Sequence, residues 1–306
     1  MDILVVGSYV TDLVVTTEKM PYPGETVLGN TFSVYPGGKG ANQAVAASRL
    51  GAKVSMSGKV GDDANGKMMI DTMKEEHVDI SHTYIEKNMT TGVGSITIDS
   101  SGQNRIVVVP GANMTYQKEE LEHLDTQLRD VDMVMCQLEI PYETVMAVAD
   151  KCYDNQVPFL LNPAPASVLN DRLLSRVDFL TPNETEIEIL TGRTCKTTQD
   201  VVDASKELIC KGVKNVIVTL GSKGALIVNK DMVKVIKGYP VEAIDTVAAG
   251  DCFNGAFAAA TTKGLSIEEA VRYANGAAAL SVTKNGAIPS LPNSEDVKAL
   301  TGGDLC

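Results

Sequence analysis

Short runs of aliphatic and β-branched residues alternate with helical patterns along most of the chain, and this alternation constrains the fold more than any other feature. Residues 3–6 read as a buried strand, residues 40–50 as a helix rich in small residues, and residues 53–58 as a second strand. Parallel strands are joined by crossover connections that are usually helices. The sequence therefore predicts an α/β fold with a mostly parallel sheet.

The same pattern continues through the rest of the chain. Further strands are predicted at residues 131–138, 157–162, 179–180, 216–220 and 224–228. Helices are predicted at residues 66–76, 143–155, 184–191, 198–211, 250–263 and 266–285. Ligands of open α/β sheets bind beyond the carboxyl ends of the strands, so we expect the functional site there.

Two segments interrupt this alternation. Residues 13–35 and 92–109 read as strands joined by turn residues, away from the strand–helix repeats. We expect them to form one small antiparallel sheet that covers the crevice as a lid, inserted into a large domain of residues 1–12, 36–91 and 110–306. An open sheet with an apolar face favours burial against a second subunit, so a homodimer through the lid is expected.

Composition excludes several classes of function. The net charge of −12, the absence of Trp and the 5% aromatic content argue against nucleic-acid binding. No stretch approaches the about 18 apolar residues of a membrane span, and the N-terminus lacks a basic flank, so a cytoplasmic protein without a membrane partner is expected. The cysteines lack a CxxC pair and are expected to be reduced thiols: Cys136, Cys152, Cys195, Cys210, Cys252 and Cys306.

The segment DTVAAGDCFNGA, at residues 245–256, carries the strongest catalytic candidate, Asp251. Small residues before Asp251 let the backbone approach a ligand, and the predicted helix would point its first N–H groups at that ligand. A helix cap or first-turn acid explains an aspartate there equally well. Asp245, in the same turn, favours a general base beside an anion hole, which takes a proton from a hydroxyl that attacks phosphorus.

A second segment, PGGKGANQA at residues 36–44, resembles a phosphate loop but lacks the Walker spacing. A helix-opening turn with an exposed Lys39 explains it equally well on local grounds. Placed after a lid strand, Asn42 would face inward, where its amide can hydrogen-bond a polyol. The segment alone therefore leaves both interpretations open.

A third segment, TPNETE at residues 181–186, follows a predicted strand and opens a predicted helix. Asn183 as a cap, with Glu184 and Glu186 as first-turn acids, explains it without any ligand. In the functional interpretation, these side chains hold Mg²⁺-bound waters and phosphate oxygens.

Weaker candidates lie at other strand ends. Asp12 and Glu139 follow strands at the carboxyl edge, where carboxylates can accept hydrogen bonds from sugar hydroxyls, although a surface turn also explains Asp12. Residues 219–224 (TLGSKG) are a strand and a turn that a simple hairpin also explains. No role is assigned to the histidines: His77, His82 and His123.

Together these motifs resemble the ribokinase family of carbohydrate kinases over essentially the whole chain. The resemblance rests on the order and spacing of GS (7–8) with Asp12, PGET (23–26), GGKGANQAVAA (37–47), VGDD (60–63), GAN (111–113), QLE (137–139), LNPAPA (161–166), TPNETE (181–186), TLGSKG (219–224), DTVAAGD (245–251) and KNGAIPS (284–290). It implies a ribokinase-like three-layer αβα sandwich with a mostly parallel sheet and a small β-sheet lid that forms the dimer. It also implies transfer of the γ-phosphate of ATP to a sugar, with Mg²⁺ as cofactor and K⁺ as a monovalent activator.

The resemblance also implies residue roles. Asp251 is the base that deprotonates the sugar 5-hydroxyl, and the anion hole comprises Ala248, Ala249 and Gly250 with the N–H of Asp251. The sugar site comprises Val10, Asp12, Gly38, Lys39, Asn42, Glu139 and Asp251. The nucleotide side comprises Asn183, Glu186, Thr219, Gly221, Gly224 and Asn275, with Glu186 holding Mg²⁺ through water. The monovalent-cation site, mostly of carbonyl oxygens, comprises Asp245, Val247, Ser281, Lys284, Gly286 and Ser290.

One position departs from the ribose-specific members of the family. Those members usually read Gly-Ser-x-Asn-x-Asp near the start, whereas Val10 stands here in place of the Asn. The deoxyribose-phosphorylating branch is apolar at this position. An unpartnered buried hydroxyl costs about 1–3 kcal/mol, so Val10 favours a 2-deoxy sugar by roughly 5- to 100-fold. Asp12 or a water can compensate for the lost partner, so ribose and 2-deoxyribose both remain substrates to consider.

Two other functions remain as alternatives. A nucleoside or other furanose kinase of the same family would keep the same motifs, although GGKGANQA and LNPAPA favour the free-pentose branch. A non-catalytic sugar-sensing protein would not need the intact Asp251 and its small-residue turn. An NAD enzyme is disfavoured because no GxGxxG follows the first strand.

Overall fold

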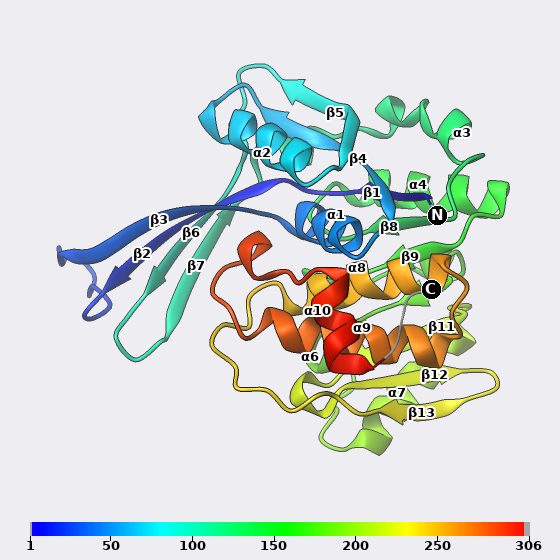
Figure 1. Cartoon of the computed structure of the whole chain (residues 1–306). Helices are drawn as coiled ribbons and strands as arrows, with labels where there is room; N and C mark the ends of the chain where they lie inside the picture. The colour runs from blue at the N-terminus through cyan, green and yellow to red at the C-terminus, as the bar shows by residue number, and fades with distance from the viewer. Residues whose placement is uncertain (1, 303–306) are drawn as a thin grey trace.

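The computed structural model describes residues 2–302, which form a body around a nine-stranded sheet and a four-stranded sheet that projects from the body (Figure 1). The strand order in the body is β13-β12-β11-β10-β9-β8-β1-β4-β5. Only the β11–β12 and β12–β13 pairs are antiparallel, which confirms a mostly parallel sheet. The strands are β1 (Asp2–Val6), β4 (Lys53–Gly61), β5 (Asp79–Glu86), β8 (Met133–Cys136), β9 (Phe159–Leu161), β10 (Phe179–Leu180), β11 (Asn215–Thr219), β12 (Ala225–Asn229) and β13 (Val233–Ile236).

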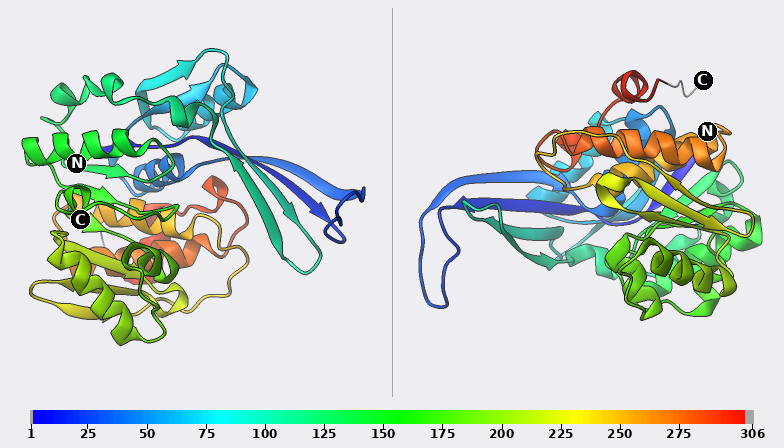
Figure 2. Two further views of the ribbon diagram at one scale, coloured as in Figure 1. Left: turned by 180° about the vertical axis from the view of Figure 1, so that it is seen from behind. Right: turned by 90° about the horizontal axis from the view of Figure 1, so that it is seen from below.

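Helices cover both faces of this sheet because successive residues of a buried strand point to opposite sides. Ile3 and Val5 of β1 pack into a core with α1, α2, α8, α9 and α10, whereas Leu4 and Val6 pack into a second core with α4, α6 and α7 (Figures 1 and 2). These layers confirm the αβα sandwich. The helices are α1 (Lys39–Arg49), α2 (Ala64–Glu75), α3 (Leu124–Gln127), α4 (Tyr142–Asn155), α5 (Asp171–Leu174), α6 (Glu184–Thr191), α7 (Thr198–Cys210), α8 (Ala249–Thr262), α9 (Ile267–Ser281) and α10 (Ser294–Thr301).

The projecting sheet, which we call the lid, has the order β3-β2-β6-β7 (Figure 2). It comprises β2 (Val10–Thr17), β3 (Gly29–Gly37), β6 (Gly92–Ile98) and β7 (Asn104–Val109). The expectation of a purely antiparallel lid is wrong, because the central strands β2 and β6 pair in parallel. Strands β2 and β6 both run outward from the body, and their antiparallel partners β3 and β7 run back toward it. Two hairpins therefore lie side by side.

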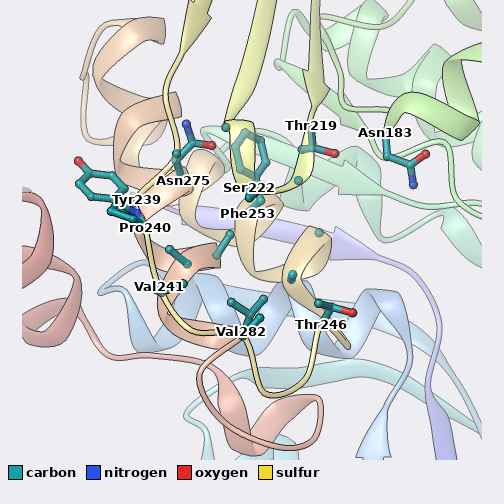
Figure 3. Close-up of a pocket in the computed structure, with 18 of the residues that line it drawn as sticks. Asn183, Thr219, Ser222, Tyr239, Pro240, Val241, Thr246, Phe253, Asn275 and Val282 are labelled. Atoms are coloured by element: carbon teal, nitrogen blue, oxygen red, sulfur yellow. The ribbon is translucent and has the colours of Figure 1, made fainter. Parts of the chain in front are cut away.

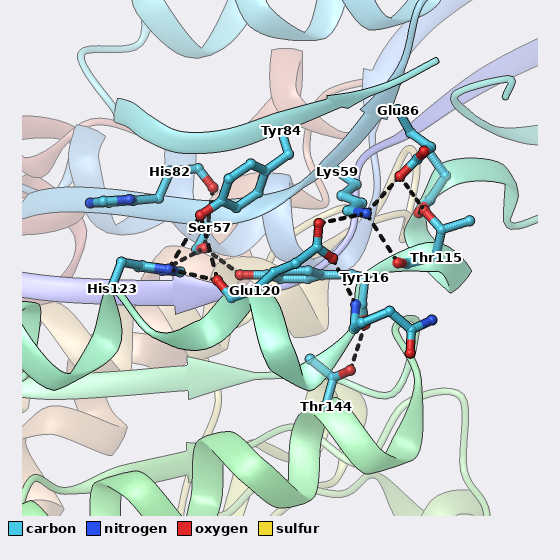
Figure 4. Close-up of polar contacts among 12 residues, drawn as sticks. Ser57, Lys59, His82, Tyr84, Glu86, Thr115, Tyr116, Glu120, His123 and Thr144 are labelled. Carbon is cyan, nitrogen blue, oxygen red and sulfur yellow. Dashed lines mark hydrogen bonds and ion pairs between the residues drawn. The ribbon is translucent and has the colours of Figure 1, made fainter. Parts of the chain in front are cut away.

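A partly buried polar cluster joins β4 and β5 to the segment at residues 111–123 (Figure 4). Lys59 is almost fully buried, and its ammonium contacts Glu86 at 2.6 Å and Glu120 at 2.9 Å. His82 and His123 stack with their ring centroids 4.2 Å apart, and burial, reinforced by His82, lowers the pKa of His123 to about 4. None of these residues lines the cavities described below, so this cluster supports the edge of the sheet.

The remaining expectations concern thiols and membranes. The five cysteines within residues 2–302 are free, and Cys306 lies outside the described residues. None of the helices in this range combines the length and apolarity that crossing a bilayer would require.

Candidate active site

Predicted site residues converge at the carboxyl edge of the body sheet. Glu139 lies shortly after β8, Asn183 shortly after β10, and Thr219 ends β11. Helices α1 and α8 begin beside this edge, and they pack against each other through their small residues. The topology therefore brings together motifs that lie up to about 200 residues apart, as in the 2.9 Å bond from Asn42 to Asp251.

Asp251 lies in the first turn of α8 and is 6% exposed. Its Oδ2 accepts a hydrogen bond from Nδ2 of Asn42 at 2.9 Å, and its Oδ1 accepts one from Nε2 of Gln43 at 3.0 Å. No side chain caps α8, so the explanation of Asp251 as a helix cap is wrong. Its carboxylate is held instead by two amide groups from α1.

The backbone before Asp251 takes an unusual conformation. Ala248 has φ 59° and ψ 9°, a left-handed conformation that costs a residue with a Cβ of order 1–3 kcal/mol. The N–H of Ala249 makes a long bond, 3.3 Å, to the Thr246 carbonyl. The N–H groups of Gly250 and Asp251 find no acceptor within residues 2–302, so they are available to an anion at the positive end of the helix dipole.

Two cavities meet at this turn. The larger, about 770 Å³, has apolar walls that include Tyr239, Phe253 and Val282, with Asn183, Thr219 and Asn275 on its rim (Figure 3). The smaller, about 210 Å³, is lined by a more polar set that includes Lys39, Glu186 and Asp251. The residues that line both cavities are Asn183, Thr219, Thr246, Ala249 and Gly250. An elongated ligand with an apolar ring and an anionic tail fits this arrangement.

Glycines shape the larger cavity where it meets the β11–β12 turn. Gly221 and Gly224 line it, and both have positive φ values. A Cβ on Gly224 would lie 2.1 Å from the Ile236 carbonyl oxygen, so only glycine fits. The turn is the hairpin that its sequence allowed, and it also borders the cavity.

Asp12 follows β1 in the chain, as its sequence position suggested, and it lies within the lid strand β2. Gly37 and Gly94 flank its carboxylate: a Cβ on either would lie within 2.9 Å of a carboxylate oxygen. The carboxylate has no hydrogen-bond partner within residues 2–302. Burial raises the pKa of Asp12 to about 6, and the negative charges of Glu139 and Asp251 reinforce the effect.

Lys39 stands among these carboxylates at the start of α1. Burial opposes its charge, but Asp251, Glu139 and other carboxylates outweigh that effect and raise the pKa of Lys39 overall. Glu139 accepts hydrogen bonds from Ser8 Oγ at 2.5 Å and from the Lys39 N–H at 3.0 Å, which fastens α1 to the end of β1. The segment does open helix α1, but Lys39 is half-buried among the carboxylates of the site, so its interpretation as an exposed residue is wrong.

Asn183 and Glu186 form a capping box at the start of α6. The Glu186 N–H donates to Asn183 Oδ1, and the Asn183 N–H donates to Glu186 Oε2, each at 2.8 Å. The capping explanation is confirmed, yet both residues also line the smaller cavity. Burial raises the pKa of Glu186.

The predicted cation residues are only partly brought together. The Asp245 carboxylate accepts from the N–H groups of Val247 at 3.0 Å and Gly286 at 2.9 Å, which joins the turn before α8 to the loop after α9. Ser281 and Ser290 are buried and donate their hydroxyls to nearby carbonyls, whereas Lys284 is exposed. Within residues 2–302, no three His, Cys, Asp or Glu side chains gather as metal ligands, and a site of carbonyl oxygens would not be such a group.

Sequence reasoning missed Gln43 and Asn162. Gln43 Nε2 donates to Asn162 Oδ1 at 3.1 Å as well as to Asp251. The available signal was a pair of adjacent amides, Asn42 and Gln43, in a helix that is otherwise small and apolar at its buried positions. Val10, predicted to border the sugar, is 6% exposed at the start of β2.

Comparison with known proteins agrees with this geometry. The family model for pfkB family carbohydrate kinases matches residues 1–294. A ribokinase of Haemophilus influenzae is 42% identical over 95% of this chain and 95% of that protein. A deoxyribokinase of Salmonella typhi is 39% identical over 96% of this chain and 97% of that protein. The structure of Arabidopsis thaliana ribokinase complexed with ribose and ATP superposes with a TM-score of 0.94 at 34% identity, covering 99% of each chain.

These findings define the class of the protein. The chain belongs to the pfkB family of carbohydrate kinases. It is an ATP:sugar phosphotransferase of the ribokinase type, with the ribokinase-like fold.

Proposed function

We propose that this chain is a pentose kinase that transfers the γ-phosphate of ATP to the 5-hydroxyl of 2-deoxy-D-ribose or D-ribose. Val10 favours 2-deoxyribose of the two sugars. One observation carries the proposal: the Asp251 carboxylate is held by two amides and lies beside helix N–H groups that no side chain caps, at the turn where the two cavities meet. Asp251 then takes the hydroxyl proton as the sugar oxygen forms its bond to phosphorus, and the N–H groups of Gly250 and Asp251 stabilise the charge on the phosphoryl oxygens.

The polar groups around Asp251 suit a polyol. Asn42 donates its Nδ2 to Asp251, and its Oδ1 is buried without a partner within residues 2–302. Asp12 offers a carboxylate with no hydrogen-bond donor within residues 2–302, and Lys39 offers a half-buried ammonium. Acceptors and donors of this kind bind sugar hydroxyls in a desolvated site.

The larger cavity suits the nucleotide. Tyr239, Phe253 and Val282 provide apolar contacts for a base, and Thr219, Gly221 and Gly224 border the route toward the α8 turn. Asn183 lines both cavities and Glu186 lines the smaller one, and the two side chains fit a hydrated Mg²⁺ held through water. When bound, Mg²⁺ neutralises charge on the phosphates.

A coupled ADP assay with a sugar panel tests this function. We expect kcat/KM to be largest for 2-deoxyribose or ribose, ahead of fructose and of a set of nucleosides. A nucleoside preferred over both pentoses would instead support a nucleoside kinase. Sugar binding in calorimetry without ADP formation would support a sugar sensor.

Val10→Asn is expected to shift the preference toward ribose. The new amide can pair with the 2-hydroxyl, which is worth about 1–3 kcal/mol, so the ribose-to-deoxyribose ratio of kcat/KM should rise roughly 5- to 100-fold. Val10→Ala serves as the control, because it removes bulk without adding a hydrogen-bond partner. An unchanged ratio in Val10→Asn would show that this position does not select the sugar.

We propose that Asp245, Val247, Ser281, Lys284, Gly286 and Ser290 surround an activating monovalent cation, with K⁺ as the expected ion. Since the Asp245 carboxylate joins the loop after α9 to the turn that precedes Asp251, a cation held there would order that turn. K⁺ at about 100 times its Kd should stabilise the folded protein by about 2.7 kcal/mol. We expect Tm and kcat to rise with K⁺ at constant ionic strength, and Asp245→Asn to lose both responses while exposed Asp231→Asn keeps them. Equal Tm values in K⁺ and choline would contradict the proposal.

We propose that the lid forms a homodimer. All six residues of β7 are exposed, and this strand is an edge of the lid sheet, a surface that folded proteins usually cover. The exposed apolar side chains of β3 and β7 are Phe32, Val34, Ile106, Val107, Val108 and Val109.

Sedimentation should give a mass near twice the 32.5 kDa of one chain. Phe32→Glu places a charge at a lid side chain that is 64% exposed, so it should shift the protein toward monomer. Val168→Glu, at a body residue that is 79% exposed, should leave the mass unchanged. A monomeric wild-type protein at micromolar concentration would rule out this interface.

A further inference from the structure

Gln43 is a fully buried amide beside the proposed base, and the function above assigns it no role. Its Nε2 donates to Asp251 Oδ1 at 3.0 Å and to Asn162 Oδ1 at 3.1 Å. Its Oε1 accepts from Gln137 Nε2 at 2.7 Å. Every polar atom of the Gln43 side chain is therefore engaged, and one of its bonds ends on the carboxylate of Asp251.

A backbone carbonyl fixes the direction of this chain of amides. The Thr181 carbonyl can only accept, so Asn162 must turn its Nδ2 toward it, at 3.1 Å. The Oδ1 of Asn162 then faces Gln43, which must present its NH₂ group there and toward Asp251. The orientation of the Gln43 amide therefore follows from the network.

Close packing keeps the far end of the chain in place. Gln137 is fully buried, and a Cβ on Gly7 would lie 2.3 Å from its Oε1. Since Gln43 Oε1 can only accept, Gln137 must present its Nε2 there, at 2.7 Å, while its own Oε1 is buried without a hydrogen-bond partner within residues 2–302. Gln43 cannot offer Oε1 to Asp251 without breaking this bond.

The network fixes the orientation of the Asp251 carboxylate. Its Oδ2 accepts from Asn42 and its Oδ1 accepts from Gln43, so amide N–H groups hold both oxygens. A carboxylate held in one orientation can present an oxygen to a substrate hydroxyl, as a general base requires.

We propose that Gln43 is a positioning residue for phosphoryl transfer: through the chain Gln137–Gln43–Asp251 it fixes the rotamer of the Asp251 carboxylate. This inference rests on the proposed role of Asp251 as the base. The sugar O–H bond breaks, its proton moves to an Asp251 oxygen, and the electron pair of the sugar oxygen forms the bond to phosphorus while ADP leaves. Gln43 lines neither of the two cavities.

The test compares two substitutions of nearly equal size. Gln43→Glu places a carboxyl group against Asp251, and two carboxylates in such contact have one strongly raised pKa. We expect the acidic limb of the kcat–pH profile to move up by at least about one unit and kcat at pH 7 to fall at least about tenfold. Gln43→Met removes the donor without adding charge, so kcat should fall with a smaller shift of the limb.

Other charged groups also face Asp251, so the readout must separate them. They come from α1, β2, the loop after β8 and α6: Lys39, Asp12, Glu139 and Glu186. The variants leave these groups in place, and Gln199→Glu on the exposed side of α7 makes the same chemical change far from them. A ¹³C-carboxyl titration of the protein without substrate follows Asp251 independently of turnover, with Asp251→Asn to assign its resonance.

The outcomes are distinct. A lower kcat and a shifted Asp251 titration in Gln43→Met, with ADP affinity and fold retained, support the proposal. If Gln43→Glu does not fold, the Gln43→Met titration and kcat decide it. Gln43 variants that lower Tm but leave the titration of Asp251 and the kcat–pH profile unchanged overturn the proposal alone. An Asp251→Asn variant with normal turnover overturns the base assignment as well.

Discussion

Asp251→Asn is expected to lower kcat by about 10²–10⁴-fold, the usual contribution of a general base. The substitution keeps the size of the side chain but removes its ability to take a proton. It also turns an NH₂ group toward the Asn42 or Gln43 donors, which disturbs the geometry of both bonds. Steady-state ADP formation with saturating sugar and ATP measures the loss.

As a control, the Asp251→Asn variant should still bind the nucleotide. Asp251 lines the smaller cavity and not the larger one, so calorimetry should give an ADP affinity within a few-fold of the wild type. Asp231→Asn, the same change on an exposed turn, should leave both quantities intact. Turnover of Asp251→Asn near the wild-type rate would remove Asp251 as the base.

Gly38→Ala is expected to have the largest effect on folding among the site substitutions. Gly38 has φ +92°, and a Cβ there would lie 2.6 Å from the backbone nitrogen of Val10. Left-handed strain of about 1–3 kcal/mol adds to an overpacking cost of about 1–3 kcal/mol. The helix α1 must move, and it carries Lys39, Asn42 and Gln43, so kcat/KM for the sugar should fall about 10²-fold.

Gly264→Ala is the matched control for this prediction. Gly264 has φ +86°, but nothing lies within 4 Å of a Cβ placed there. The substitution should therefore add only backbone strain, which lowers the unfolding free energy by about 1–3 kcal/mol, and it should leave kcat/KM unchanged. Urea unfolding separates the two variants, and equal losses of unfolding free energy would show that contact with β2 adds nothing.

Much of the fold could be predicted because its buried strands are short aliphatic runs. The strand at Ile3–Val6 and the helix that follows Gly38 are examples, since their burial depends mainly on local composition. The edge strands β5 and β13 were missed, because DISHTYIE and VKVI mix polar and apolar residues that face different surroundings. The end of α9 at Ser281 was placed four residues too late, since no proline or glycine lies between Ser281 and Asn285.

The candidate site was predictable only in part. Asp251 and Asn42 belong to motifs that the family resemblance identifies, and the structure places them in contact. Gln43 was missed because its partners, Asp251 and Gln137, are 208 and 94 residues away, and no local pattern predicts that convergence. The parallel pairing of β2 with β6 was missed for a related reason, because it depends on where two hairpins leave the body.

The central claim is that this enzyme moves a phosphoryl group onto the 5-oxygen of a pentose. The direct measurement incubates the protein with ATP, Mg²⁺, K⁺ and ¹³C-labelled 2-deoxyribose or ribose, and locates the phosphate through carbon–phosphorus coupling. We predict coupling to C5 and ADP in equal amount to the sugar phosphate, with neither product in the same time from Asp251→Asn. Phosphate on C1, or no ADP above background with either pentose, would contradict the claim.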